Sequence, residues 1–258
     1  MELTILGKSP AMPDAGGANS GYLLREGEFT LLIDCGAGVF SKLRALADPL
    51  ALDAVLITHL HADHVSDLIP LGHALSFVWR ESGRRPVLWG PPEGIERFAQ
   101  LGVLLGAAGL IANSFHVHEY DPDQSLQLGP FTVSFAQVPH YVPTWACDLR
   151  SAEGRRLTFG ADCAPNEVMT NFASGTDLLM LEATEGPEPP RPGALPNGSV
   201  RGHLSSREAG EMAAWAKAKR LLLTHYSDQL DGEQLRSSAQ AVFDGSVLLA
   251  CEGDRHVV

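Results

Sequence analysis

The sequence predicts one large domain that mixes helices and strands, on the evidence of its length, its composition and two alternating hydrophobic patterns. With 258 residues, 45% hydrophobic and 19% charged, the chain can bury an extensive core and has too balanced a composition for a disordered protein. Strand-like and helix-like runs alternate along its whole length. We therefore expect a single domain over residues 1–258.

Nine segments have the pattern of short strands. They are rich in aliphatic and β-branched residues and are bounded by Gly, Pro or Asp, and segment 131–135 alternates apolar with polar residues as a half-buried strand does. The expected strands cover residues 2–6, 22–25, 29–34, 54–58, 131–135, 157–160, 178–181, 221–224 and 247–250.

Other segments have the pattern of helices. The clearest one starts with the capping box Ser205-Ser206-Arg207-Glu208 and continues through an Ala-rich stretch to Lys219. Further helices are expected over residues 38–47, 64–78, 93–105 and 231–243. Residues 10–21 and 186–202 are rich in Pro and Gly, so we expect them to form ordered loops or lids rather than helices or central strands.

The composition excludes several classes of protein. Lys and Arg number 19 against 31 Asp and Glu, a formal net charge of -12, whereas nucleic-acid binders depend on Lys and Arg contacts to phosphate. Four scattered cysteines without a C-x-x-C pair favour a reducing compartment. There is no signal-peptide pattern, and no apolar run approaches the roughly 18 residues of a membrane span. We expect a soluble, cytoplasmic protein with no membrane partner and no extended nucleic-acid partner.

The segment His59-Leu60-His61-Ala62-Asp63-His64 carries the strongest chemical signal and follows an expected strand. Imidazole nitrogens and carboxylates are ligands suited to zinc, manganese or iron(II). In an extended turn His59 and His61 point to one side while Asp63 and His64 diverge, so that this one segment can serve two adjacent metals.

Two metals need more ligands than this segment supplies. His140, Asp162 and His225 each follow an expected strand, and functional groups at strand ends above a sheet are common. For each of the three residues an ordinary turn role is the alternative, most of all for Asp162, because Asp is a common turn former.

Together these motifs resemble the metallo-β-lactamase superfamily over essentially the whole chain, from Ile33-Asp34-Cys35-Gly36 to the last strand. Gly202-His203-Leu204-Ser205, placed before an Ala-rich helix, is similar to the ribonuclease Z and cyclic-phosphodiesterase branch. The resemblance implies an α+β fold, an αββα sandwich of two mixed β-sheets flanked by helices. It also implies a dinuclear, usually zinc, site at one edge of the sandwich.

The resemblance implies a role for each candidate residue. The implied ligands are His59, His61 and His140 for one metal, Asp63, His64 and His225 for the second, and Asp162 as the bridge. We expect two Zn²⁺ per chain, although the same ligands accept Mn²⁺ or Fe²⁺. A hydroxide bridging the metals would attack the substrate. Asp63 and His203 are the expected catalytic residues, His203 as the general acid; the alternative for His203 is to cap the following helix.

The branch follows from the distance along the chain between His140 and Asp162. Ribonuclease Z enzymes that process tRNA insert a flexible arm in this interval, but 22 residues leave no room for it. Two divalent ions with Asp63, Asp162 and hydroxide leave a charge of about +1, which suits a phosphodiester monoanion. We therefore expect a phosphodiesterase acting on a small anionic substrate, linear or cyclic. A thioesterase, a lactonase and a non-catalytic metal-binding member are the alternatives, and a homodimer is left open.

Some residues keep two interpretations. Asp34 either orients a ligand histidine through a hydrogen bond or closes a turn. His116 and His118 form either an accessory metal site or, as we favour, a solvated strand face. Tyr141 and Trp145 either shape the substrate pocket or belong to the core.

Overall fold

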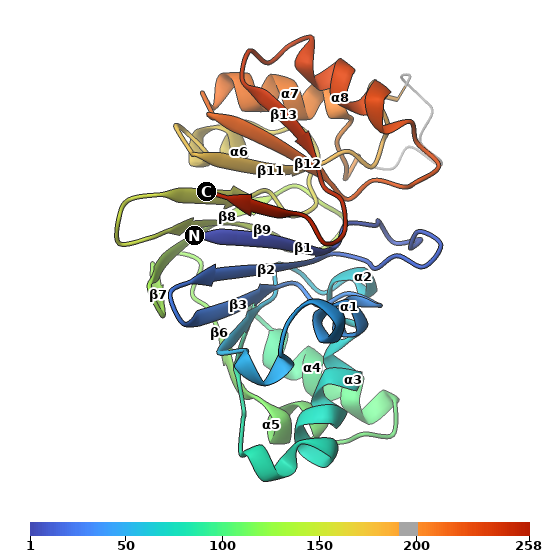
Figure 1. Ribbon diagram of the computed structural model, residues 1–258, viewed down its shortest axis with the longest axis vertical. Helices are drawn as coiled ribbons and strands as arrows, with labels where there is room; N and C mark the ends of the chain where they lie inside the picture. Colours follow the sequence, from blue (N-terminus) through green and yellow to red (C-terminus); the bar gives the residue numbers. More distant parts are fainter. Residues whose placement is uncertain (191–200) are drawn as a thin grey trace.

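Two seven-stranded sheets form the centre of the computed structural model, which describes residues 1–190 and 201–258 (Figure 1). The first sheet, in spatial order, consists of β14 (Arg255–Val257), β1 (Glu2–Gly7), β2 (Gly21–Glu26), β3 (Phe29–Ile33), β4 (Ala54–Leu56), β5 (Val87–Gly90) and β6 (His116–Glu119). The second consists of β13 (Ser246–Leu249), β12 (Arg220–Thr224), β11 (Leu178–Glu182), β10 (Arg156–Phe159), β9 (Thr144–Arg150), β8 (Phe131–Val138) and β7 (Leu126–Leu128).

Both sheets are mixed. Strands β3 to β6 are parallel in the first sheet and β10 to β13 are parallel in the second, while the remaining pairs in each sheet are antiparallel. The parallel strands need crossover connections, and helices supply most of them. Each sheet therefore acquires a helical layer on its outer face.

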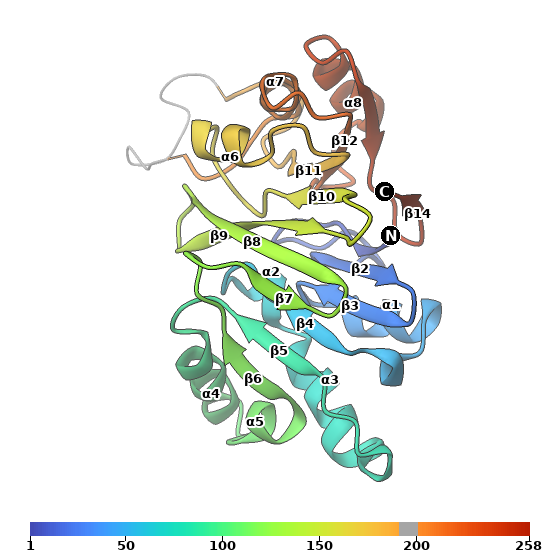
Figure 2. The ribbon, with the colours of Figure 1, turned by 90° about the vertical axis from the view of Figure 1, so that its left-hand side faces the viewer.

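The helices form two outer layers, which Figures 1 and 2 show at opposite ends of the molecule. On the first sheet lie α1 (Val39–Leu46), α2 (Ala62–Val65), α3 (Leu68–His73), the π-helical turn η2 (Ala74–Val78), the 3₁₀ turns η1 (Pro49–Ala51) and η3 (Arg80–Ser82), α4 (Gly94–Leu104) and α5 (Leu110–Ser114). On the second lie α6 (Glu167–Phe172), α7 (Ser206–Trp215) and α8 (Gly232–Gln240).

The period-2 alternation of the strands separates the layers. In β3, Leu31 and Ile33 belong to the core between the two sheets, whereas Leu32 packs with the helices α1 to α5. In β12, Leu222 faces the other sheet, while its neighbours Leu221 and Leu223 pack against α6 to α8. Strands buried on both faces read as continuous aliphatic runs. The expected αββα sandwich of two mixed sheets is confirmed.

The helix expected over residues 64–78 is wrong as a single element. It is divided into α2, α3 and η2, with the first break at Ser66 and Asp67. Pro70 has no N–H to donate to the carbonyl of Ser66, so a continuous helix would lose a hydrogen bond there. The break turns the chain immediately after the histidine-rich segment.

The capping box at Ser205 and Glu208 is present, but α7 ends at Trp215 rather than Lys219. Lys217 adopts a left-handed conformation with φ of 52°, and the N–H of Ala218 donates to the carbonyl of Ala213. This is the hydrogen bond of a Schellman-type helix end.

Several elements were not expected from the sequence, namely β5, β7, β9, β14, α5 and α6. Strand β9 is central and almost completely buried, so it shows no alternation of apolar and polar residues. Strands β7 and β14 have three residues each, too few for a periodic pattern. Residues 10–20 form the expected loop between β1 and β2. Of the loop expected over 186–202, residues 191–200 lie outside the described residues.

Among the described residues, no helix is both long enough and apolar enough to cross a membrane.

Candidate metal centre

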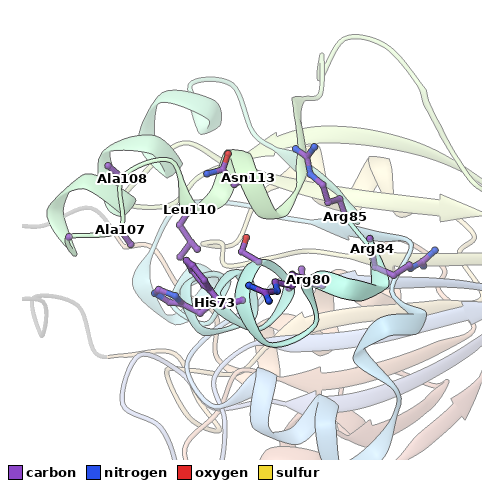
Figure 3. Close-up of a pocket in the computed structure, with 13 residues that line it drawn as sticks. His73, Arg80, Arg84, Arg85, Ala107, Ala108, Leu110 and Asn113 are labelled. Carbon is purple, nitrogen blue, oxygen red and sulfur yellow. The ribbon is translucent and has the colours of Figure 1, made fainter.

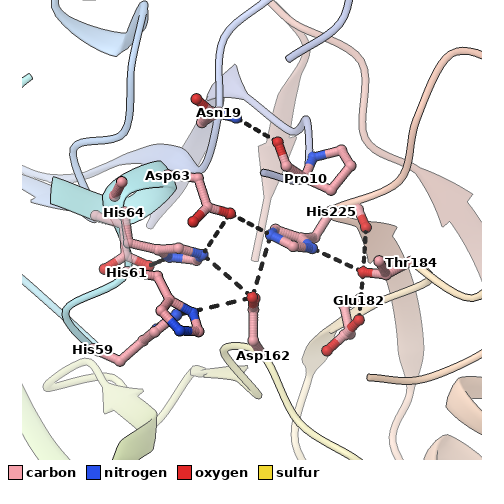
Figure 4. Close-up of polar contacts among 12 residues, drawn as sticks. Pro10, Asn19, His59, His61, Asp63, His64, Asp162, Glu182, Thr184 and His225 are labelled. Carbon is pink, nitrogen blue, oxygen red and sulfur yellow. Dashed lines mark hydrogen bonds and ion pairs between the residues drawn. The ribbon is translucent and has the colours of Figure 1, made fainter. Parts of the chain in front are cut away.

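The candidate site lies at the edge of the sandwich where parallel strands of both sheets end (Figure 4). Asp34 directly follows β3 and His225 directly follows β12, while His59 and Asp162 each lie three residues beyond the ends of β4 and β10. The carboxyl ends of parallel strands share one edge of a sheet. The topology therefore brings together residues that are far apart in the sequence.

The backbone turns sharply at three of these strand ends. Asp34, Ala161 and His225 have φ angles of 57°, 52° and 50°. A left-handed conformation costs a residue other than glycine about 1–2 kcal/mol, and such conformations concentrate at functional sites. Here they redirect the chain so that the carboxylates and the imidazole enter the same space.

Seven side chains at this edge form two overlapping groups that can each hold a metal ion. Within each group the candidate ligand atoms lie within 4.8 Å of one another. The first group is His59, His61, His140 and Asp162, and the second is Asp63, His64, Asp162 and His225. The partition is the one that the family resemblance implied.

Asp162 lies at the centre of both groups. Its Oδ2 atom is 3.3 Å from His225 Nε2, 3.5 Å from His64 Nε2, 3.8 Å from His140 Nε2 and 3.9 Å from His59 Nε2. The carboxylate is 2% exposed. This position between two sets of imidazoles is the one that a bridging ligand requires.

The imidazoles of the first sheet are oriented by a buried carboxylate and a threonine. His64 Nδ1 donates to Asp34 Oδ2 over 2.8 Å, and Asp34 also accepts from the Thr58 hydroxyl. The Thr58 hydroxyl in turn accepts from His59 Nδ1 over 3.0 Å. Asp34 therefore has the contacts of the orienting interpretation as well as a position in a turn. Such bonds commonly fix a ligand histidine with Nε2 toward the metal.

The histidines of the second sheet are oriented in the same way. His225 Nδ1 donates to the Thr184 hydroxyl over 2.9 Å, and His140 Nδ1 donates to the carbonyl of Gly202 over 2.7 Å. His61 differs, because its Nδ1 atom lies 3.1 Å from His140 Nε2. Four imidazoles thus offer Nε2 to the centre and one offers Nδ1.

Three polar atoms at this centre are buried without a hydrogen bond to any described residue. They are His59 Nε2, His64 Nε2 and Asp162 Oδ1. An unpaired buried polar group costs about 1–3 kcal/mol. Coordination to divalent cations would compensate all three, so the residues present fit a metal centre.

The protonation of the first group also fits metal binding. Burial lowers the pKa of His59 well below its ordinary value, lowers that of His61, and lowers that of His140 to about 4. The neutral imidazole is the form that coordinates a metal. Burial opposes ionisation of Asp162, but the charges of His225 and His64 outweigh it and hold the pKa of Asp162 well below its ordinary value.

Beside the metal groups lies a hydrogen-bonded relay that the sequence interpretation missed. His203 Nδ1 donates to the carboxylate of Glu182, at 2.9 Å from Oε2, and Glu182 is completely buried at the end of β11. The Thr184 hydroxyl donates to the same carboxylate over 2.5 Å. Burial opposes charging of His203, but the bond to Glu182 and its charge raise the pKa of His203 to about 9. The sequence signal that could have indicated Glu182 and Thr184 is the Glu-Ala-Thr triplet at the end of the aliphatic strand β11.

Glu182, His203 and His225 form a third group with the spacing of a metal site. Its Glu182 carboxylate and His203 Nδ1 already bond to each other, and the three unpaired buried atoms of the centre all belong to the first two groups. The hydrogen bonds therefore identify this third group as a relay rather than a further metal site.

A cavity of about 390 Å³ opens above the metal groups. The β1–β2 loop contributes Pro10, Ala11 and Met12 to its wall, and Tyr141 and His203 also line it. His203 Nδ1 is occupied by Glu182, so Nε2 is the nitrogen left to meet a substrate. The pocket interpretation of Tyr141 thus fits its position, whereas Trp145 is a buried residue of the core between the sheets.

Other histidines lie away from this centre. His116 and His118 are exposed on β6 and belong to none of the metal-competent groups among the described residues. The His118 ring instead stacks on Trp89 at 4.9 Å. This is the expected solvated strand face.

A larger cavity of about 680 Å³ lies between α3, η2, η3 and α5 and is lined by His73, Arg80, Arg84 and Arg85 (Figure 3). Two of its guanidinium groups already bond to the protein: Arg84 to the carbonyls of Leu50 and Leu52, and Arg85 to those of Ala112 and Phe115. These hydrogen bonds connect the segment before β5 to residues in and just after η1 and α5. The two arginines lie apart from the metal groups.

Comparison with known proteins places the chain in a family. The "Beta-lactamase superfamily domain" matches residues 30–226. "Probable metallo-hydrolase YhfI" of Bacillus subtilis (strain 168) is 34% identical over 257 residues, covering 98% of each chain. The crystal structure of YhfI, described as a metallo-β-lactamase fold protein, has a TM-score of 0.85 at 32% identity and covers 99% of this chain and 98% of that chain.

More distant relatives carry names of phosphoester chemistry. "Ribonuclease Z" of Mycobacterium bovis (strain BCG / Pasteur 1173P2) is 27% identical, covering 96% of this chain and 94% of the relative. A diphosphatase from the PhnP family has a TM-score of 0.72 at 20% identity, covering 100% of this chain and 97% of that one; at this identity the likeness concerns the fold alone. From the family match and the similarity to YhfI, the chain belongs to the metallo-β-lactamase superfamily.

Proposed function

We propose that the chain is a metal-dependent hydrolase that cleaves a small or cyclic phosphodiester with two divalent cations, most readily Zn²⁺. The observation that carries this proposal is the convergence of unpaired imidazole and carboxylate atoms around Asp162 beside the Glu182–His203 pair. With divalent cations bound, the imidazole and carboxylate groups would hold the charge that binds and polarises an anion. The Glu182–His203 pair can deliver a proton to a leaving group.

Each residue has a distinct part in the proposed reaction. His59, His61 and His140 would hold one cation, Asp63, His64 and His225 the other, and Asp162 both. When bound, the cations supply Lewis acidity and activate water for attack at neutral pH. Asp34 and Thr58 keep their histidines oriented toward the metals, as Thr184 does for His225.

His203 would act as the general acid. Its Nδ1–H is held by Glu182, so that the protonated imidazole can donate from Nε2 to the oxygen that leaves phosphorus. The raised pKa of His203 keeps this nitrogen protonated near neutral pH. Nearby cations would lower this pKa again and so increase the acidity of the donor.

A small substrate fits better than a tRNA. The interval between His140 and Asp162 holds only β9, a five-residue turn and β10, and the chain has a net charge of -12. A phosphoester substrate agrees with the name of the ribonuclease Z relative.

The test combines elemental analysis with a hydrolysis panel. We expect about two divalent cations per chain in protein purified without chelators, and faster hydrolysis of a phosphodiester than of a glutathione thioester or a lactone. His203→Ala should lower kcat for a cyclic ribonucleoside phosphodiester about 10²–10⁴-fold while leaving the metal content unchanged.

Three outcomes would contradict the proposal in different ways. Faster thioester or lactone turnover would assign the other hydrolase class. Less than one metal per chain would indicate a non-catalytic member. Loss of metal from His203→Ala would make His203 structural or a ligand.

A further inference from the structure

The ring of Tyr141 lies directly on the backbone of Gly202. A Cβ atom built at Gly202 would lie 2.7–2.9 Å from three carbons of this ring, closer than side chains approach each other. Gly202 does not adopt a left-handed φ. A side chain at this position would therefore have to displace the ring of Tyr141, which is 52% exposed.

The same glycine is bound to the metal centre through its carbonyl. His140 Nδ1 donates to Gly202 O over 2.7 Å. Tyr141 is the next residue after His140, so two successive side chains contact Gly202, one by a hydrogen bond and the other by its ring. The ring of Tyr141 lies 5.5 Å from that of His203, and the ring of His140 lies 4.9 Å from it.

His203 has no regular secondary structure of its own, because it precedes α7. On its C-terminal side the chain is fixed by buried Leu204, whose carbonyl accepts from Glu185 N, and by the capping box of Ser205. On its N-terminal side Arg201 donates two hydrogen bonds to Glu208, and His140 and Tyr141 contact the chain at Gly202. The imidazole must satisfy Glu182 and still reach the cavity.

We propose that Tyr141 is a positioning residue that acts through Gly202 to hold His203 beside the metal centre. This inference rests on the proposed function, in which His203 protonates the leaving group. The Tyr141 ring blocks displacement of the Gly202 peptide toward that ring, and the bond from His140 holds the peptide beside the candidate metal ligands. Tyr141 acts by its ring, since its hydroxyl has no hydrogen bond to the described residues.

The decisive measurement compares two phosphodiesters that differ in their need for a proton. A cyclic ribonucleoside phosphodiester expels an alkoxide and needs the acid, whereas bis(p-nitrophenyl) phosphate expels a stable anion and does not. Misplacement of about 1 Å can cost roughly 10²-fold in rate. Gly202→Ala should therefore lose about 10–100-fold in kcat on the cyclic substrate and less than about 3-fold on the other.

Variants at Tyr141 separate the ring from the hydroxyl. Tyr141→Ala should show the same substrate-dependent loss, whereas Tyr141→Phe should keep the wild-type ratio of the two kcat values. The double variant Tyr141→Ala/Gly202→Ala should be no worse than Tyr141→Ala, since the added methyl group then has no ring to meet. All four variants are assayed at saturating metal, with the loading checked by elemental analysis, because displacement of Gly202 also disturbs its bond to the candidate ligand His140.

Gly90→Ala is the matched control for general crowding. A Cβ at Gly90 would also meet an aromatic ring at 2.7 Å, that of Phe98 in the helical layer on the first sheet. It should lower the melting temperature without changing the ratio of the two activities. In wild-type protein, NMR should show a slowly exchanging His203 Nδ1 proton, which Gly202→Ala should lose or broaden.

Equal losses on both substrates in Gly202→Ala, or a Tyr141→Phe variant as impaired as Tyr141→Ala, would overturn the inference. So would an unchanged Nδ1 proton in Gly202→Ala. Failure of the proposed function is distinguished by His203→Ala: if that variant does not discriminate between the substrates, His203 is not the acid, and the NMR measurement still tests its positioning.

Discussion

The two sheets use one hydrogen-bonding device for different purposes. In the first sheet, Asp34 bonds to the Thr58 hydroxyl and to His64, and Thr58 bonds to His59.

In the second sheet, Glu182 bonds to the Thr184 hydroxyl and to His203, and Thr184 bonds to His225. In both, the carboxylate lies at the end of a parallel strand and is completely buried.

The difference lies in where the histidine bound to the carboxylate points, which is His64 in the first sheet and His203 in the second. His59 and His64 are completely buried among the candidate ligands, whereas His203 lines the cavity with its side chain 18% exposed. The comparison teaches that one backing arrangement can orient an imidazole for a metal or for a proton transfer. Whether the imidazole faces the centre or the open pocket decides between them.

Loss of the carboxylate in the second sheet should have the largest effect on catalysis. Glu182→Gln is expected to lower kcat for a cyclic phosphodiester about 10²–10⁴-fold. The acid must be protonated, so activity falls as the pH rises through the pKa of His203. Since Glu182 raises this pKa, the basic limb of the pH–rate profile should lie at lower pH in the variant than in the wild type. A pH–rate profile of kcat measures both effects.

A double variant checks that Glu182 acts through His203. In Glu182→Gln/His203→Ala, the loss should be close to that of His203→Ala alone, because residues in one network are not additive. Multiplicative losses would show that Glu182 acts elsewhere and would end the parallel between the two sheets.

Loss of the carboxylate in the first sheet should instead act on metal binding. Asp34→Asn is expected to weaken metal affinity about 10–100-fold, because the carboxylate orients His64. Titration against a chelator of known affinity measures this change. Asp53→Asn is the control, since its carboxylate bonds to Thr30 N and Arg84 away from the centre. Equal affinities of the two variants would contradict the orienting role of Asp34.

The two threonines should give the smallest and most similar effects. Thr58→Val and Thr184→Val each remove one hydroxyl from a buried relay, worth about 0.5–1.5 kcal/mol. Thr58→Val should weaken metal affinity alone, whereas Thr184→Val should weaken affinity and lower kcat, since Thr184 contacts both His225 and Glu182. Chelator titration and kcat on the same preparations compare them; identical profiles would remove the functional distinction between the sheets.

Much of the candidate site could be predicted from the sequence because its residues are rare types at strand ends. His59 to His64 are consecutive, and His140, Asp162 and His225 each follow a recognisable strand. Glu182 was missed because a single Glu after an aliphatic strand resembles a surface residue that closes a turn. Its burial and its bond to His203 arise only when β11 packs inside the second sheet.

The sequence by itself determined most of the strand and helix segments and the set of chemically competent residues, because alternation marks which face of a strand is buried and residue type limits which ligands are available. The sandwich of two mixed sheets was implied by the family resemblance rather than by these local patterns. The break of the expected 64–78 helix at Ser66 and Asp67 could also have been predicted from the N–H that Pro70 lacks.

Only the tertiary structure decided which residues meet. The bond between His140 and Gly202 and the contact of Tyr141 with Gly202 join segments about 60 residues apart, and the grouping around Asp162 joins residues from His59 to His225. Their geometry depends on sheet register and left-handed turns at strand ends, and a backbone shift of about 1 Å would undo it. Such distances are properties of the packed fold, because no local pattern encodes them.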